Sequence, residues 1–115
     1  MVTGEGLRQI CLSLPEVEEK PHFDRTSFRI GVPRGKIFAT MTKDGSSANL
    51  VLSRDEQHLL CAAEPDMFAP VPNKWGEKGS TMIALERADG ITLRSACQMA
   101  WRRAAPPKLW ALIDN

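Results

Sequence analysis

The sequence predicts an α+β protein in which an antiparallel β-sheet of hairpins packs against N-terminal, middle and C-terminal helices. Three observations support this fold class. Apolar residues recur at helical spacing near both ends of the chain, and apolar and polar residues alternate between residues 27 and 52. A capping motif at Ser53 begins a further helix. Strands and helices do not alternate regularly, so a parallel sheet is not expected.

The first helix is expected over Thr3–Leu14, where an apolar stripe recurs at helical spacing before Pro15. The stripe consists of Leu7, Ile10, Cys11 and Leu14. Glu16, Glu18 and Glu19 follow, with Pro21 soon after them. We expect an irregular acidic connector here, because proline opposes a regular helix.

Three short strands are expected between residues 27 and 52. In Ser27–Val32, apolar residues at every second position oppose Arg29, and Lys36–Thr42 repeats the alternation. The two strands form a hairpin through Pro33, Arg34 and Gly35. An Asp-Gly pair within Lys43–Ser47 predicts a second turn, after which Asn49–Leu52 forms the third strand.

A capping box marks the middle helix, since Glu56 follows Ser53 by three residues. The helix is expected over Arg54–Ala63, with His58 as a partly buried structural residue among leucines. The stretch Met67–Gly79 is rich in proline and glycine, and we expect a strand edge and a long loop there.

The last strand is expected over Thr81–Leu85, which is short, β-branched and apolar. The strongest helical periodicity follows over Thr92–Ala104. Its stripe consists of Leu93, Ala96, Cys97, Ala100, Trp101 and Ala104. Two prolines separate it from a final helical turn over Leu109–Ile113. Trp101 and Trp110 lie on these helical segments and should belong to the core.

Length and composition limit the classes of protein. A chain of 115 residues fits one domain over residues 1–115, and no signal peptide or membrane span is seen, which favours the cytoplasm. Three widely spaced cysteines, Cys11, Cys61 and Cys97, are expected to be buried reduced thiols. No cofactor loop or catalytic motif appears, so we expect a non-enzymatic protein without catalytic residues, cofactor or metal.

Cations are concentrated in one stretch although the net charge is only +1. Residues 20–43 hold six Lys or Arg against one Asp, with acidic flanks. We predict nucleic-acid binding through phosphate contacts, in which long side chains at hairpin turns gather on one side. The predicted contact residues are Arg29, Arg34, Lys36, Lys43, Lys74, Trp75 and Lys78. Alternatively, the charges form a solvated surface that serves solubility.

Several ordered segments resemble the MmcQ/YjbR-like family of small bacterial proteins over nearly the whole chain. These segments are Leu14–Glu19, Arg25–Phe28, Lys36–Ala39, Leu59-Leu60 before Pro65, Lys74–Gly76, and Ala100–Arg102 followed by Ala105-Pro106. The resemblance implies a CyaY-like fold, with paired hairpins described as a double wing and proposed to touch DNA. It implies no catalytic residues.

Other functions remain open at the level of sequence. The CyaY-like arrangement also serves frataxin-type proteins, so Glu16, Glu18 and Glu19 could bind hard cations weakly. His22, Lys36 and Trp75 could line one pocket of an enzyme or of a small-ligand site. A domain that binds a partner protein is a further alternative. Trp75 either stacks on a ligand or plugs the end of the sheet. We expect a monomer, or a weak homodimer through an edge strand near Met67–Pro70.

Overall fold

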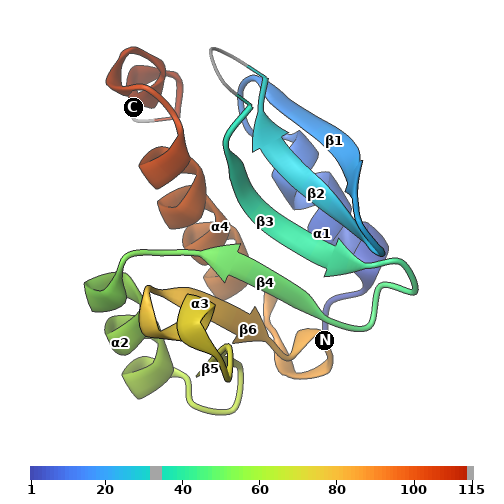
Figure 1. Ribbon diagram of the computed structural model, residues 1–115, viewed down its shortest axis with the longest axis vertical. Helices are drawn as coiled ribbons and strands as arrows, with labels where there is room; N and C mark the ends of the chain where they lie inside the picture. The colour runs from blue at the N-terminus through green and yellow to red at the C-terminus, as the bar shows by residue number, and fades with distance from the viewer. Residues whose placement is uncertain (32–34, 114–115) are drawn as a thin grey trace.

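The computed structural model describes residues 1–31 and 35–113. Its centre is a six-stranded antiparallel sheet in the order β1-β2-β3-β4-β6-β5 (Figure 1). The strands are β1 Val17–His22, β2 Arg25–Ile30, β3 Ile37–Thr42, β4 Ala48–Val51, β5 Phe68–Pro70 and β6 Ser80–Ile83. The helices are α1 Gly4–Leu12, α2 Arg54–Ala63, α3 Lys74–Glu77 and α4 Gly90–Ala104, with 3-10 segments at Leu85–Arg87 and Pro107–Leu112. The predicted α+β class is confirmed.

Two helices cover one face of the sheet and form the core with it. α4 contacts β2, β3 and β4, and α1 contacts both β1 and α4. Both helices lie behind the sheet in Figure 1. The largest fully buried side chains in this layer include Trp101, Phe28, Phe38, Leu7, Leu50 and Leu93. Each removes apolar area from water, which stabilises the fold by about 1.5–3 kcal/mol per side chain.

Trp101 also ties the helix layer together. Its ring is fully buried, and its Nε1 donates to the Pro15 carbonyl oxygen at 2.9 Å, just beyond α1. Trp110 is only half-buried, and its Nε1 donates to the Arg102 carbonyl oxygen at 3.0 Å. Both tryptophans pack against the core, which the helical periodicity had indicated.

The expected acidic connector is instead strand β1, so that prediction was wrong. Val17–His22 pairs with β2 over six residues, from Val17 opposite Ile30 to His22 opposite Arg25. Pro21 is compatible with this pairing because β1 is an edge strand and has a neighbour on one side only. Apolar and polar residues do not alternate along the strand, because Glu19 and Pro21 occupy the positions on the helix side where apolar residues would mark a strand.

The hairpin β2–β3 contains a register shift that the alternation did not reveal. The shift lies between Phe28 and Arg29, and it places Ile37 opposite Arg29. Phe38 is therefore fully buried beside Ala39, although strict alternation predicts that they lie on opposite faces. Val32, Pro33 and Arg34, which the sequence assigns to the strand end and turn, lie outside the described residues.

The middle of the chain was predicted in part. α2 matches its expected range and has the complete capping box between Ser53 and Glu56. The expected long loop contains β5 and also α3, a short helix whose N-cap Asn73 accepts hydrogen bonds from the Trp75 and Gly76 amides. Gly76 is required there because a Cβ atom would collide with the Val71 carbonyl group.

The cysteines are free thiols, as expected. Cys11 on α1 and Cys97 on α4 are buried, whereas Cys61 is half-buried. A hydrogen bond with Cys97 and burial both raise the pKa of the Cys11 thiol, which is therefore protonated at neutral pH. Within residues 1–31 and 35–113, every helix is too short or too polar to cross a membrane.

Candidate nucleic-acid interface

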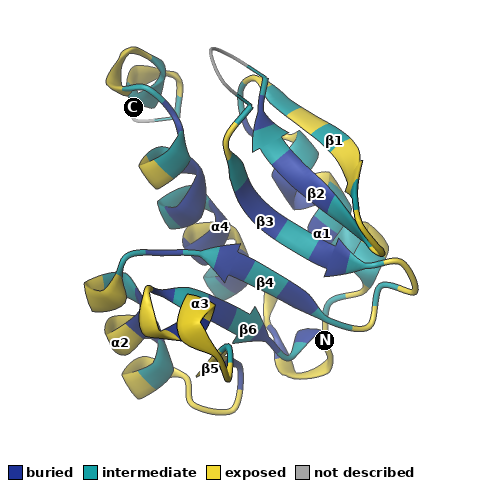
Figure 2. Cartoon of the chain, viewed as in Figure 1, coloured by how far each residue is buried: buried dark blue, intermediate teal, exposed yellow. Residues whose placement is uncertain are grey.

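The sheet face opposite α1 and α4 is rich in polar side chains, and we call it the open face. Strand alternation fixes its composition, because residues directly opposite one another in register share a face. One row across the strands joins Lys20, Ser27, Thr40 and Asn49. The neighbouring rows add Glu18 with Arg29, and His22 with Arg25 and Thr42. In Figure 2 buried and half-buried positions alternate along β4, as this arrangement requires.

Two arginines lie along this face and are held by hydroxyl groups. Arg25 Nε donates to Thr40 Oγ1 at 3.1 Å. Arg29 donates to Ser27 Oγ through Nε at 3.2 Å and through a terminal nitrogen at 2.7 Å. Ser27 is fully buried and in turn donates to the Lys20 carbonyl oxygen at 2.8 Å. Both guanidinium groups are thus oriented by neutral partners.

Neither arginine forms an ion pair with any carboxylate among the described residues. Glu18 lies on the same face, but its ion pair is with Lys20 at 3.6 Å. One terminal nitrogen of Arg25 is buried and has no hydrogen-bond partner within the described chain. The open face therefore carries two positive charges that no described acidic side chain balances.

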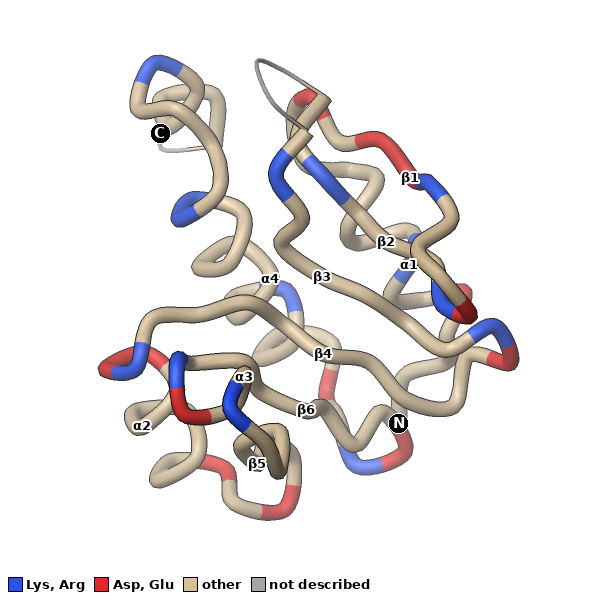
Figure 3. Tube along the Cα trace, viewed as in Figure 1, with Lys and Arg blue, Asp and Glu red and all other residues tan. Residues whose placement is uncertain are grey.

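The predicted contact residues do not gather at hairpin tips on one side. Lys36 precedes β3 and Lys43 follows it, so the two lie at opposite ends of one strand (Figure 3). Seven residue steps at about 3.3 Å each separate them by roughly 23 Å. The β2–β3 and β3–β4 hairpins share strand β3, so their tips point in opposite directions. Arg34 lies outside the described residues.

Lys74, Trp75 and Lys78 lie on and beside α3, which contacts β6 and is drawn in front of it in Figure 1. Trp75 is 67% exposed, so it does not plug the end of the sheet. The Lys78 Nζ atom lies 5.6 Å from the centre of the Trp75 ring, at the range of a cation–π contact. Among the predicted cations that lie within residues 1–31 and 35–113, only Arg29 is a strand residue of the open face.

The turn between β1 and β2 carries a site that the sequence analysis missed. Phe23 is 90% exposed and has a φ of 57°, in the left-handed region. The ring of His22 meets it edge to face, with ring centres 4.8 Å apart. A signal in the sequence could have revealed this region. Lys20 and His22 stand two residues apart before the turn, and Arg25 and Arg29 follow it, so basic side chains recur at even spacing on both sides of the turn.

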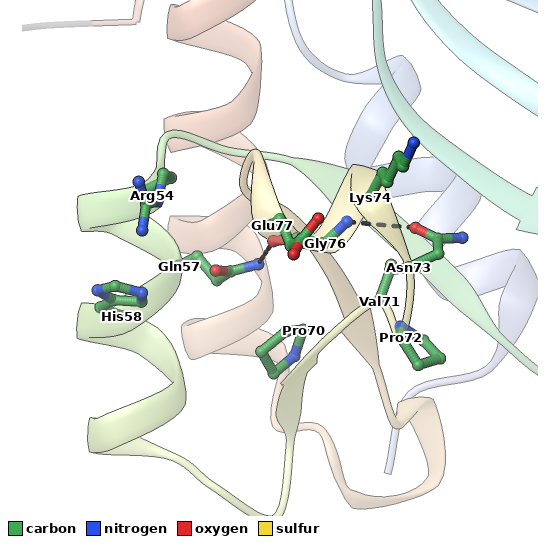
Figure 4. Close-up of a pocket in the computed structure, with 10 residues that line it drawn as sticks. All are labelled: Arg54, Gln57, His58, Pro70, Val71, Pro72, Asn73, Lys74, Gly76 and Glu77. Atoms are coloured by element: carbon green, nitrogen blue, oxygen red, sulfur yellow. Dashed lines mark hydrogen bonds between the residues drawn. The ribbon is translucent and has the colours of Figure 1, made fainter.

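A separate groove of about 860 Å³ lies between α2, the end of β5 and α3 (Figure 4). Arg54, His58 and Lys74 line it, together with a proline-rich wall. His58 is exposed, not partly buried as predicted, because it lies on the outer side of α2. The predicted pocket of His22, Lys36 and Trp75 is not formed, since β1 and β6 are separated by three strands.

The acidic cluster does not form a metal site. Strand alternation places Glu18 on the open face, whereas Glu19 on the helix side accepts a hydrogen bond from Arg8 Nε at 2.6 Å. Glu16 lies before the strand with a φ of 62°. No group of three potential metal ligands occurs within the part of the chain that the structure describes. The hypothesis of frataxin-like cation binding therefore has no support from the positions of these three glutamates.

The fold and the open face place the protein in the class of small α+β proteins in which helices cover one side of an antiparallel sheet. The family model YjbR matches residues 12–103, and the chain belongs to the YjbR family. A similar solved structure is that of Deinococcus radiodurans protein DR2400, with the domain DUF419.

That structure has a TM-score of 0.70 and 22% sequence identity, covering 87% of this chain and 76% of that chain. At this identity the likeness shows the fold alone. None of the curated proteins matches the sequence. The fold class and the resemblance to the MmcQ/YjbR-like family are thus confirmed.

Proposed function

We propose that the protein is a non-enzymatic module that binds nucleic acid through phosphate contacts on the open face. The observation that carries this proposal is the pair Arg25 and Arg29, which lie half-buried on the open face and form no ion pair within the described chain. Guanidinium groups bind phosphate oxygens with strong charge-assisted hydrogen bonds. Holding them on a rigid sheet reduces the entropy lost on binding.

The cations near the rim of the sheet extend this surface. Lys36 directly precedes β3, whose first residue Ile37 faces Arg29 in register, and Lys74 and Lys78 lie in and directly after α3, which contacts β6. The net charge of +1 provides little long-range attraction. Binding should therefore depend on local contacts, fall as salt screens them, and show little sequence preference.

Replacement of Arg29 tests the proposal. Arg29→Gln removes the charge and retains a donor for Ser27 Oγ, so the sheet should remain intact. Fluorescence anisotropy with a labelled mixed-sequence 20-mer DNA should show weaker binding. The slope of log K against log salt should become less steep by about 0.7–0.9, because one phosphate contact is lost.

Arg94→Gln is the matched control. Arg94 is exposed on α4, the helix that covers the opposite face, and the substitution changes the net charge equally. Its affinity should match that of the wild-type protein. Absence of DNA binding by the wild-type protein at low salt, or equal losses in both variants, would refute the proposal.

A further inference from the structure

The tip of the β1–β2 hairpin presents a large apolar side chain to solvent for no structural reason. Phe23 is 90% exposed, so its ring contributes almost nothing to the core. Its backbone has a φ of 57°, a region that glycine and asparagine adopt more readily than an aromatic residue. Neither burial nor turn geometry therefore accounts for phenylalanine at this position.

The surroundings of Phe23 indicate what the ring could contact. The edge-to-face contact with His22 restricts the ring to one side of the turn. Arg25 follows two residues later, faces His22 in register and belongs to the open face. The turn thus carries an exposed aromatic ring two residues before Arg25, which forms no ion pair with Asp24 or any other carboxylate within the described chain. An aromatic and a cationic side chain in such proximity along the chain can contact a base and its phosphate together.

We infer that Phe23 stacks on an unpaired base, and that the nucleic acid bound by the open face is single-stranded. This inference rests on the proposed function and specifies its substrate class. A duplex keeps its bases stacked inside, where a side chain at a hairpin tip does not reach their faces without unstacking them. A single strand offers every base as a stacking surface, irrespective of sequence.

Trp75 on α3 provides a second exposed aromatic side chain across the sheet. It is 67% exposed, and Lys78 lies over its ring at 5.6 Å. From β1 to β6 there are four interstrand spacings of about 4.8 Å, so the two aromatic positions flank a surface roughly 19 Å wide. β2, which carries Arg25 and Arg29, lies between β1 and β6 in the sheet order. A short single strand that crosses the β-strands could contact both ends of this surface.

The test compares Phe23→Ala and Phe23→Asn with the wild-type protein. Each is titrated against a labelled single-stranded 12-mer of mixed sequence and against the same sequence as a duplex. We expect the wild-type protein to prefer the single strand. Loss of the ring should weaken single-strand binding by roughly 5- to 100-fold, the range for one base–aromatic stack, and leave duplex binding unchanged. Asn tolerates the left-handed backbone, so this variant keeps the turn.

Ile91→Ala is the matched control, because Ile91 on α4 is 86% exposed and equally apolar. It should bind as the wild-type protein does. A 12-mer with 2-aminopurine provides a direct readout, since stacking on Phe23 should quench its fluorescence only when the ring is present. Circular dichroism checks that every variant is folded.

The outcomes separate the two proposals. If the wild-type protein binds neither probe, the proposed function fails. If it binds both probes equally and Phe23→Ala leaves both affinities unchanged, the stacking inference fails and phosphate binding stands. Equal losses of affinity for the single strand and for the duplex would also overturn the inference, because the contribution of the Phe23 ring to binding would then not require unpaired bases.

Discussion

Gln57 shows how a single polar residue organises the region around the groove. It is 3% exposed, and its Nε2 donates to the Gly76 carbonyl oxygen at 2.9 Å (Figure 4). The same nitrogen donates to the Ser80 carbonyl oxygen, also at 2.9 Å. Two carbonyl partners fix the orientation of the amide, because only the nitrogen can donate to them. Gln57 thereby joins α2 to α3 and β6.

Replacing Gln57 by methionine should lower the free energy of unfolding by ~2 kcal/mol. Methionine has a similar volume, but it leaves both carbonyl oxygens without this donor, and unsatisfied buried acceptors are costly. Urea denaturation measures the effect. His58→Ala, one residue along on the exposed side of α2, should change stability by less than about 0.5 kcal/mol. Equal effects of the two substitutions would exclude this role for Gln57.

At the scale of the element, the β3–β4 turn is held by one carboxylate. Asp44 Oδ1 accepts hydrogen bonds from the Ser46 amide at 3.0 Å, Ser46 Oγ at 2.7 Å and Thr42 Oγ1 at 2.8 Å. The Ser46 contacts foremost, together with Thr42, lower the pKa of Asp44 from 3.8 to about 2. These bonds favour the ionised form and fix the connection between two central strands.

The depressed pKa of Asp44 predicts an acid-dependent contribution to stability. Because the carboxyl binds its proton less readily in the folded state, its contribution is complete above pH 3.8 and is lost as the pH falls towards about 2. Asp44→Asn keeps an acceptor oxygen without the charge. Thermal denaturation should show a higher Tm for the wild-type protein at neutral pH, with the difference shrinking towards pH 2. A difference independent of pH would contradict this account.

For the whole molecule, the two sheet edges decide whether copies of the chain can pair. β5 is the short edge strand that the sequence placed near Met67–Pro70. The Met67 carbonyl and the Val71 amide both bond towards β6, so alternation directs the backbone of Pro70 outwards. Proline has no N–H to offer at that edge, and Pro21 lies in β1 at the other edge. Both features oppose edge-to-edge association.

Pro70→Val should therefore increase self-association. The substitution supplies an outward-facing N–H and a β-branched side chain on the exposed edge. Sedimentation equilibrium should give the wild-type protein the mass of one 12.8 kDa chain and give the variant a concentration-dependent increase. Ala69→Val is the control, because the backbone of residue 69 already bonds towards β6. Association of the wild-type protein at the same concentrations would contradict the argument.

Local signals predicted the elements whose periodicity or capping is complete within a few residues. The Ser53 and Glu56 pair predicted α2 to the residue, and the apolar stripe predicted α4 with its start two residues too late. β1 was missed because Glu19 and Pro21 stand at its helix-side positions in place of apolar residues, and α3 was missed because four residues show no period. Such elements are defined by the neighbours with which they pair or pack, which a single segment does not contain.

The sequence by itself determined the fold class, the cationic character of residues 20–43 and the burial of Trp101, since composition and periodicity are local properties. Only the tertiary structure decided which cations share a surface. It separated Lys36 from Lys43 and placed Arg25 and Arg29 on one face of the sheet. The physical reason is that strand order and register, set by long-range packing, fix the face on which each side chain lies.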